Sequence, residues 1–207
     1  MNIRAVQIWG FLFNALGWIF VACTMAMEFW KITQIGGSGG SYVVKVVWYW
    51  SSLWRSCYTT STAISNCIDF PVLWSVEDYI QVVRGLLMSG LTVGMLAFVL
   101  SFMGMECTYI GGKEHRKHKI LISGAFFHIL SGVLSFAGYL CYASRVSAEY
   151  FNPNFIGLKQ NNSAHIVSLH RFDLGTPLFL GWVGSVFEIT GGAFYCVSVR
   201  KIVSQKR

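Results

Sequence analysis

A short run with two cysteines contains the residues of this chain that could do chemistry. Leu53, Trp54 and Cys57 lie close together, and Cys67 follows ten residues after Cys57. Two thiols at this spacing suggest a disulfide between paired strands on a cell exterior, because cytosolic thiols are kept reduced. Zinc binding is the alternative use of such a pair. No second pair of cysteines or histidines at ligand spacing lies nearby, so we expect no metal site.

Long apolar stretches flank this cysteine-bearing segment and must position it. Of the 207 residues, 54% are hydrophobic and 12% are charged, about half the charged share of a soluble domain. A bilayer core requires about 20 consecutive apolar residues, and four stretches meet this length. We expect membrane spans over 8–27, 85–105, 120–143 and 175–199, separated by segments 28–84, 106–119 and 144–174, with a tail over 200–207. We expect a single domain.

The lysines and arginines predict the orientation, because cytoplasmic loops carry an excess of these residues. One side of the predicted membrane spans has nine of them against two acids, and the other side has seven against six acids. The nine are Arg4, Lys113, Arg116, Lys117, Lys119, Arg200, Lys201, Lys206 and Arg207. Both termini and segment 106–119 are therefore expected in the cytoplasm, and segments 28–84 and 144–174 outside. This asymmetry accounts for the net charge of +7, so we expect no nucleic-acid binding.

The first extracellular segment has both strand and helix patterns. Residues 42–50 are mainly β-branched and aromatic, which is typical of a strand, and the glycine-rich stretch 36–40 before them predicts a hairpin tip. Apolar residues over 72–83 have helical spacing. We expect a sheet and a short helix in this segment.

These residues resemble the claudins, the four-span strand-forming proteins of tight junctions. The claudin signature is a tryptophan early in the first extracellular segment, then Gly/Asn-Leu-Trp-x-x-Cys, a second cysteine and an arginine ahead of the second span. It is matched here by Trp30, Leu53, Trp54, Cys57, Cys67 and Arg84, and Ser52 departs from the usual glycine or asparagine. Further similarity covers nearly the whole chain and is greatest to the channel-forming claudins of the ten and fifteen types.

The resemblance implies a mainly α membrane protein, with a left-handed bundle of four transmembrane helices, an extracellular antiparallel β-sheet and a short extracellular helix. It implies a non-enzymatic adhesion protein of the plasma membrane, without a cofactor, that assembles with itself and other claudins in cis and in trans. Such a protein would control paracellular permeability as an ion-selective channel. The alternatives are a barrier-forming claudin and an auxiliary tetraspan that associates with an ion channel.

The resemblance also suggests residues that select ions. Cation-type members carry an aspartate three residues after the first cysteine, where this chain has Thr60. Asp69 keeps the second acidic position, two residues after Cys67. Lys45 and Arg55 add positive charge on or near the same sheet, so the preferred ion sign stays open. A solvated strand face is the alternative interpretation of these charges.

Lateral assembly is the second role that the resemblance implies. Leu73 and Trp74 are the candidates, and Leu73 would insert into an aromatic pocket of the next copy that involves Tyr150 and Phe151. Apolar anchors that meet aromatic residues are typical of interface hot spots. The alternative for Trp74 is a position at the lipid headgroups, where tryptophan is common. We expect Trp30 and Trp54 to seat the sheet on the headgroups.

Three further positions could be modified, and one acid lies within a span. Cys107 and Cys196, at the predicted cytoplasmic ends of two spans, are palmitoylation candidates, and Asn161 begins a glycosylation sequon. Glu188 is an intramembrane acid, which by default suggests function, but we expect a packing contact with a histidine or serine rather than transport. The sequence stops at Arg207 without the Tyr-Val tail of the family, either because this is a short-tailed member or because the tail was removed, so scaffold binding stays open.

Overall fold

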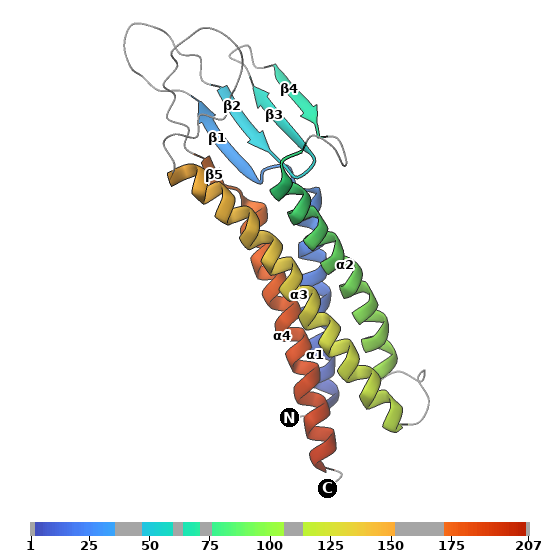
Figure 1. Cartoon of the computed structure of the whole chain (residues 1–207). Coiled ribbons are helices and arrows are strands. Elements are labelled where there is room, and N and C mark those ends of the chain that lie inside the picture. Colours follow the sequence, from blue (N-terminus) through green and yellow to red (C-terminus); the bar gives the residue numbers. More distant parts are fainter. Residues whose placement is uncertain are drawn as a thin grey trace, which may run out of the picture. The chain divides into compact units, whose positions relative to one another are not determined.

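The computed structural model describes residues 3–35, 47–59, 64–70, 76–105, 114–151 and 172–205 (Figure 1). The helices are α1 (Ile3–Ala26), α2 (Asp78–Gly104), α3 (Glu114–Phe151) and α4 (Thr176–Gln205). The strands are β1 (Lys31–Ile35), β2 (Val47–Ser51), β3 (Arg55–Thr59), β4 (Ser65–Asp69) and β5 (Phe172–Leu174). The chain divides into a helical unit of 1–26, 82–139 and 179–207 and a sheet unit of 27–81 and 140–178. The single domain stays a prediction.

Within the described residues, four helices are long and apolar enough to cross a membrane, over 3–26, 78–104, 117–148 and 176–204. This confirms the prediction of four spanning helices, although most of the helices begin before or end after the predicted spans. The extension is large at the end of α3, because residues 144–151 contain no glycine or proline that would end a helix.

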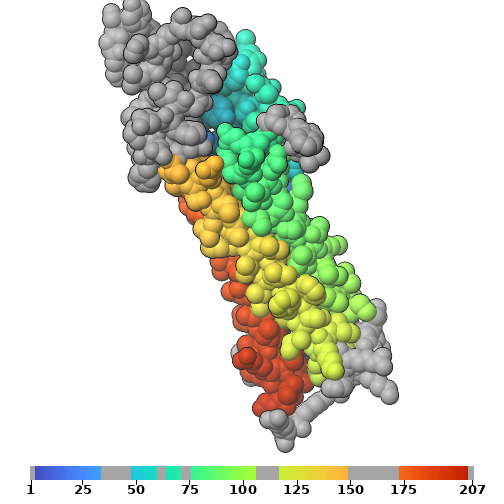
Figure 2. All heavy atoms as spheres, viewed as in Figure 1, coloured from blue at the N-terminus to red at the C-terminus, as the bar shows by residue number. Residues whose placement is uncertain are grey.

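The buried positions of the helices repeat every 3.5 residues. Alternating steps of three and four residues separate them, which is the pattern of a left-handed coiled coil. In α1 these positions include Gln7, Gly10, Asn14, Gly17, Val21 and Thr24. In α4 they include Gly184, Glu188, Gly191, Tyr195, Ser198 and Ile202. Figure 2 shows the side chains of α2, α3 and α4 filling the space along these helices.

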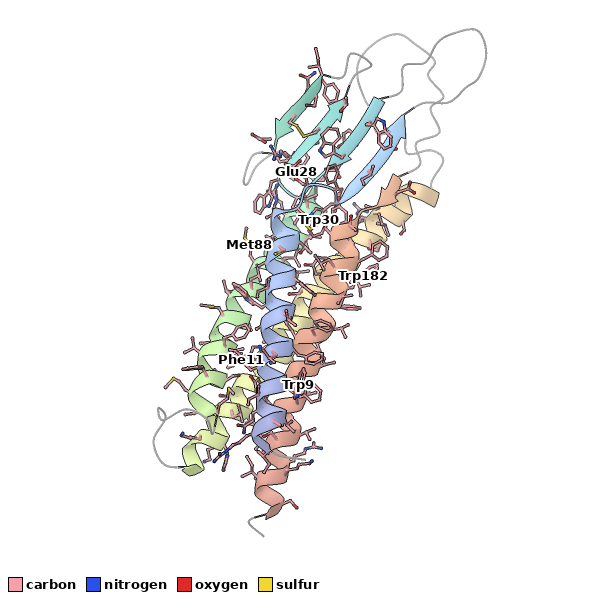
Figure 3. The ribbon with its side chains drawn as sticks, turned by 180° about the vertical axis from the view of Figure 1, so that it is seen from behind. Trp9, Phe11, Glu28, Trp30, Met88 and Trp182 are labelled. Carbon is pink, nitrogen blue, oxygen red and sulfur yellow. A yellow bond between two sulfur atoms is a disulfide. The ribbon has the colours of Figure 1, made fainter. Side chains whose placement is uncertain are left out.

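Glycines let the helices of the helical unit approach closely. A β-carbon on Gly17 of α1 would lie 2.6 Å from the carbonyl oxygen of Gly184 in α4. Small residues at such crossings are typical of helix packing in lipid. On the outer surface Trp9 and Met88 point away from the helices (Figure 3), with 59% and 44% of their surfaces exposed. The outer surface therefore suits contact with lipid chains.

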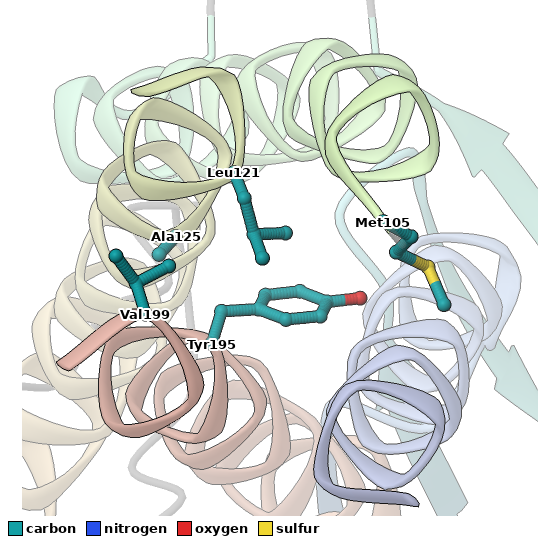
Figure 4. Close-up of a cluster of buried hydrophobic side chains, with 5 residues drawn as sticks. All are labelled: Met105, Leu121, Ala125, Tyr195 and Val199. Atoms are coloured by element: carbon teal, nitrogen blue, oxygen red, sulfur yellow. The ribbon is translucent and has the colours of Figure 1, made fainter. Parts of the chain in front are cut away.

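A compact apolar cluster joins α3, α4 and the end of α2 (Figure 4). Its members are Met105, Leu121, Ala125, Tyr195 and Val199, with Phe11 and Cys196 packed against them. Cys196, one of the two palmitoylation candidates, is thus half-buried beside the cluster. Its palmitoylation stays a prediction.

Glu188 lies buried among the helices, with 1% of its surface exposed. Its Oε2 atom is 2.7 Å from the hydroxyl oxygen of Ser131 in α3. That hydroxyl oxygen is also 2.8 Å from the carbonyl oxygen of Gly90 in α2. The sequence predicted that this acid contacts a histidine or a serine, and the contact observed is with a serine.

The sheet unit contains a five-stranded antiparallel sheet in the order β4-β3-β2-β1-β5. The short strand β5 pairs with β1, so the two predicted extracellular segments contribute to one sheet. Its close approach requires Gly175, whose backbone N–H donates to the carbonyl oxygen of Trp30 at 3.0 Å. A β-carbon there would meet the carbonyl oxygen of Phe29 at 1.6 Å.

Trp30 is fully buried in the sheet unit. Its ring packs edge-on against that of Tyr142, with ring centroids 5.1 Å apart. The prediction that Trp30 rests on lipid headgroups is therefore wrong, because protein covers the indole. Trp54 is partly buried, and its predicted contact with headgroups stays a prediction.

Two predicted elements of the first segment are described only in part. Of the predicted strand 42–50, the structure describes β2, and residues 36–46 with the glycine-rich tip lie outside the described residues. Of the predicted short helix 72–83, residues 72–75 also lie outside the described residues. From Asp78 onward its residues are the first turns of α2, since nothing in the sequence breaks the helix before the span.

Candidate functional site

The turn between β2 and β3 depends on Ser52. The Ser52 hydroxyl accepts hydrogen bonds from the backbone N–H groups of Trp54 (3.1 Å) and Arg55 (3.0 Å). The Ser52 N–H donates to the carbonyl oxygen of Arg55 at 2.8 Å. Asparagine and serine side chains both cap turns in this way. Serine at the usual glycine or asparagine position therefore preserves the turn, within which Leu53 is fully buried.

A disulfide joins Cys57 and Cys67, which confirms the pairing expected from the sequence. The two residues lie directly opposite each other in β3 and β4, with Cα atoms 4.1 Å apart (Figure 3). The bond occupies both sulfur atoms, so this pair is not a zinc site. It links the edge strand β4, whose five residues are all exposed, to the buried position of Cys57.

Three charged side chains gather at the end of this strand pair, and we call Glu28, Arg55 and Asp69 the charge cluster. Arg55 lies directly opposite Asp69 in the register of β3 and β4. Side chains in such a pair project from the same face, with β-carbons about 4.5–5.5 Å apart. The Arg55 guanidinium forms an ion pair with Glu28, and the two side chains are 44% and 36% exposed. Two acids thus compete for one arginine in contact with water.

Register determines which strand residues share the face of Asp69. The described side chains on this face are those of Ile32, Trp48, Trp50, Arg55, Cys57, Thr59, Ser65, Cys67, Asp69 and Asp173. Among these positions Arg55 is the one cation, and Asp69 and Asp173 are the acids. Both acids are exposed. The arrangement can act on mobile ions in water through fixed charge, without covalent chemistry.

Several predicted site residues lie outside the described residues, namely Thr60, Lys45, Leu73, Trp74, Cys107 and Asn161. Tyr150 and Phe151 form the last residues of α3, and their role in assembly stays a prediction. Arg84 is buried in α2, with 5% of its surface exposed. Among the described residues no group of three or more histidine, cysteine or acidic side chains could hold a metal ion.

Glu28 was not among the site residues predicted from the sequence. No sequence motif includes Glu28, because its contact with Arg55 depends on the turn at Ser52, which positions the start of β3. Its position two residues before the signature Trp30 was the available signal.

Comparison with known proteins identifies the family. Residues 4–195 match the family described as PMP-22/EMP/MP20/Claudin. The chain belongs to this family. It is 34% identical to claudin-10 of Homo sapiens over 199 residues, which are 96% of this chain and 80% of that protein. It is 32% identical to claudin-15 of Rattus norvegicus over 189 residues, which are 91% and 76%. The identity to claudin-19 of Rattus norvegicus is 29% over 192 residues, 92% and 80%.

The molecule is therefore a multi-pass membrane protein of tight junctions. As a claudin-type protein it controls paracellular permeability and interacts with other claudins, and it is a structural protein rather than an enzyme. The four membrane-spanning helices, the antiparallel sheet and the disulfide agree with this assignment.

Proposed function

We propose that this claudin-type protein forms a paracellular ion pathway that favours cations, with Asp69 as the selecting acid. The observation that supports this most is the charge on the face of Asp69. Among the described strand residues of that face, the one cation, Arg55, is already paired with Glu28. The carboxylate of Asp69 adds negative charge to the same face.

Fixed charge along a water-filled path selects ions by sign, because acidic side chains lower the energy of cations and raise that of anions. At physiological salt such a charge acts over about 8 Å, so an exposed carboxylate at a strand end can influence ions that pass beside it. Thr60 supplies no such charge. Asp69 is therefore the principal candidate for selectivity.

The proposal includes an orientation and a mode of assembly. The excess of lysine and arginine near both termini and in segment 106–119 favours their cytoplasmic location, and the sheet unit would then lie outside the cell. Neighbouring copies and other claudins would pair in cis through Leu73 and Trp74 against Tyr150 and Phe151. Copies on the opposite cell would pair in trans.

Dilution potentials across epithelial monolayers test the selectivity. Monolayers would express the natural chain, the Asp69→Asn variant, or Glu77→Gln as a control that removes one exposed acid outside the strands. We expect the natural chain to raise the sodium-to-chloride permeability ratio. Asp69→Asn should return this ratio toward that of free solution, and the control should leave it unchanged. An unchanged ratio in Asp69→Asn monolayers would contradict the role of Asp69.

Strand formation tests assembly separately. We expect junction-like strands by freeze-fracture microscopy when the chain is expressed in cells that lack tight junctions. Absence of strands, together with co-purification of an ion-channel subunit, would instead support the auxiliary-subunit alternative.

A further inference from the structure

We infer that Glu28 determines the specificity of this pathway by holding the Arg55 guanidinium away from Asp69. This inference rests on the proposed function, since it concerns the charge that Asp69 presents to ions. Asp69 is effective only while no cation neutralises it. The nearest strand neighbour that could do so is Arg55, directly across the ladder.

The contacts of Arg55 show which acid it prefers. Among the residues that the structure describes, Arg55 forms its ion pair with Glu28 and not with Asp69. Glu28 and Asp69 both lie within reach, because β4 places Asp69 opposite the first residue of β3 and Glu28 precedes β1 at the same end of the sheet. The charge that Asp69 presents therefore depends on which of the two acids pairs with Arg55.

Glu28 is well placed because the residue two positions later is fixed. The backbone N–H of Trp30 lies 3.1 Å from the carbonyl oxygen of Glu28 and 3.0 Å from that of Ser51. The Trp30 side chain is fully buried against Tyr142. On the other side of the pair, the turn at Ser52 fixes the backbone of Arg55. Two anchored backbone segments thus present Glu28 and Arg55 to each other.

An exposed ion pair of this kind contributes little to stability, so variants of Glu28 are expected to fold. Its consequence concerns the location of charge. In Glu28→Gln the guanidinium loses its partner and becomes free to pair with Asp69, which would cancel the carboxylate. Glu28→Gln should therefore act on ions much as Asp69→Asn does, although Glu28 need not touch the ions.

The experiment measures dilution potentials for Glu28→Gln, Arg55→Gln, Asp69→Asn and the double variant Glu28→Gln/Arg55→Gln, with Glu28→Asp as the conservative control. We expect Glu28→Gln to lower the sodium-to-chloride ratio, with a change of up to about five-fold in the permeability of each ion and in opposite directions, the effect of a unit charge at 4 Å in water. Glu28→Asp should keep the ratio. In the Arg55→Gln background, Glu28→Gln should change nothing, because no arginine remains to be released.

The outcomes separate this inference from the proposed function. If Asp69→Asn lowers the ratio and Glu28→Gln does not, the inference is wrong and the proposed function stands. If Asp69→Asn has no effect, the proposed role of Asp69 is wrong, and the inference is wrong with it because it rests on that role. If Glu28→Gln still lowers the ratio in the Arg55→Gln background, Glu28 acts on ions directly, and its role through Arg55 is contradicted.

Discussion

Two glutamates, Glu188 in the helical unit and Glu28 in the sheet unit, have opposite surroundings. Glu188 is 1% exposed and contacts the hydroxyl of Ser131. Glu28 is open to water and pairs with Arg55. A polar contact inside a membrane bundle replaces water that is absent there, whereas an exposed ion pair competes with water and dissolved salt. The first contact therefore serves packing, and the second leaves charge available to ions.

The same contrast applies to what stabilises each unit. Close backbone approach at small residues stabilises the helical unit, as at Gly17 and Gly184. The sheet unit has an edge strand that is exposed throughout, and a disulfide ties it to its neighbour. Four predictions test this difference, starting with the largest expected effect.

Removal of the disulfide should affect the sheet unit most. Replacing Cys57 and Cys67 together by serine should lower the free energy of unfolding by about 2–4 kcal/mol, since the bond constrains the unfolded chain. Denaturant unfolding of the purified protein followed by tryptophan fluorescence measures this change. Ser65→Ala, an exposed change on the same strand and face, is the control. Equal midpoints for the double variant and the natural chain would contradict the prediction.

Overpacking should affect the helical unit next. Gly17→Ala places a β-carbon 2.6 Å from the Gly184 carbonyl oxygen and should destabilise the protein by about 1–3 kcal/mol. Gly85→Ala is the matched control, because a β-carbon there would meet no atom within 4 Å. Thermal unfolding in detergent should separate the two variants, with Gly85→Ala equal to or above the natural chain. Equal loss in both would indicate that close helix approach is unimportant.

Loss of the buried hydroxyl should have a smaller effect. Ser131→Ala removes the partner of Glu188 and should cost about 0.6–1.7 kcal/mol, the range for hydrogen bonds between membrane helices. Ser123→Ala, on the same helix, removes a hydroxyl that donates to the carbonyl oxygen of Ile120 within that helix at 2.8 Å. The same unfolding assay compares them. A greater loss in Ser123→Ala would contradict the importance of the contact between helices.

The stability effect of Glu28→Gln should be the smallest, about 0.2–1 kcal/mol, and salt should reduce it. Repeating the unfolding measurements at low and high salt checks this point. The effect of Ser131→Ala should not change with salt, because ions do not screen a buried contact. Salt dependence in Ser131→Ala and none in Glu28→Gln would reverse the comparison between the two glutamates.

The features predicted correctly from the sequence are those that depend on local pattern and composition. Long apolar runs predicted the four spans, and the two cysteines predicted the disulfide. Arg55 and Asp69 were identified as candidates, but their direct pairing depends on the strand register. Glu28 was missed because its partner is separated from it by 27 residues and a turn.

Other features were missed for physical reasons as well. The strand β5 has three residues, too few to show an alternating pattern, and it exists because Gly175 allows close approach to β1. The burial of Trp30 depends on Tyr142, which the sequence places inside a membrane span. Such long-range contacts have no local signal.

The most direct test of the proposed function is the conductance of an epithelial monolayer with and without the natural chain, together with its sodium-to-chloride permeability ratio. We expect the conductance to rise and the ratio to exceed that of free solution, which would indicate a cation-selective path. A fall in conductance, with the protein located at cell contacts, would indicate a barrier and contradict the channel proposal.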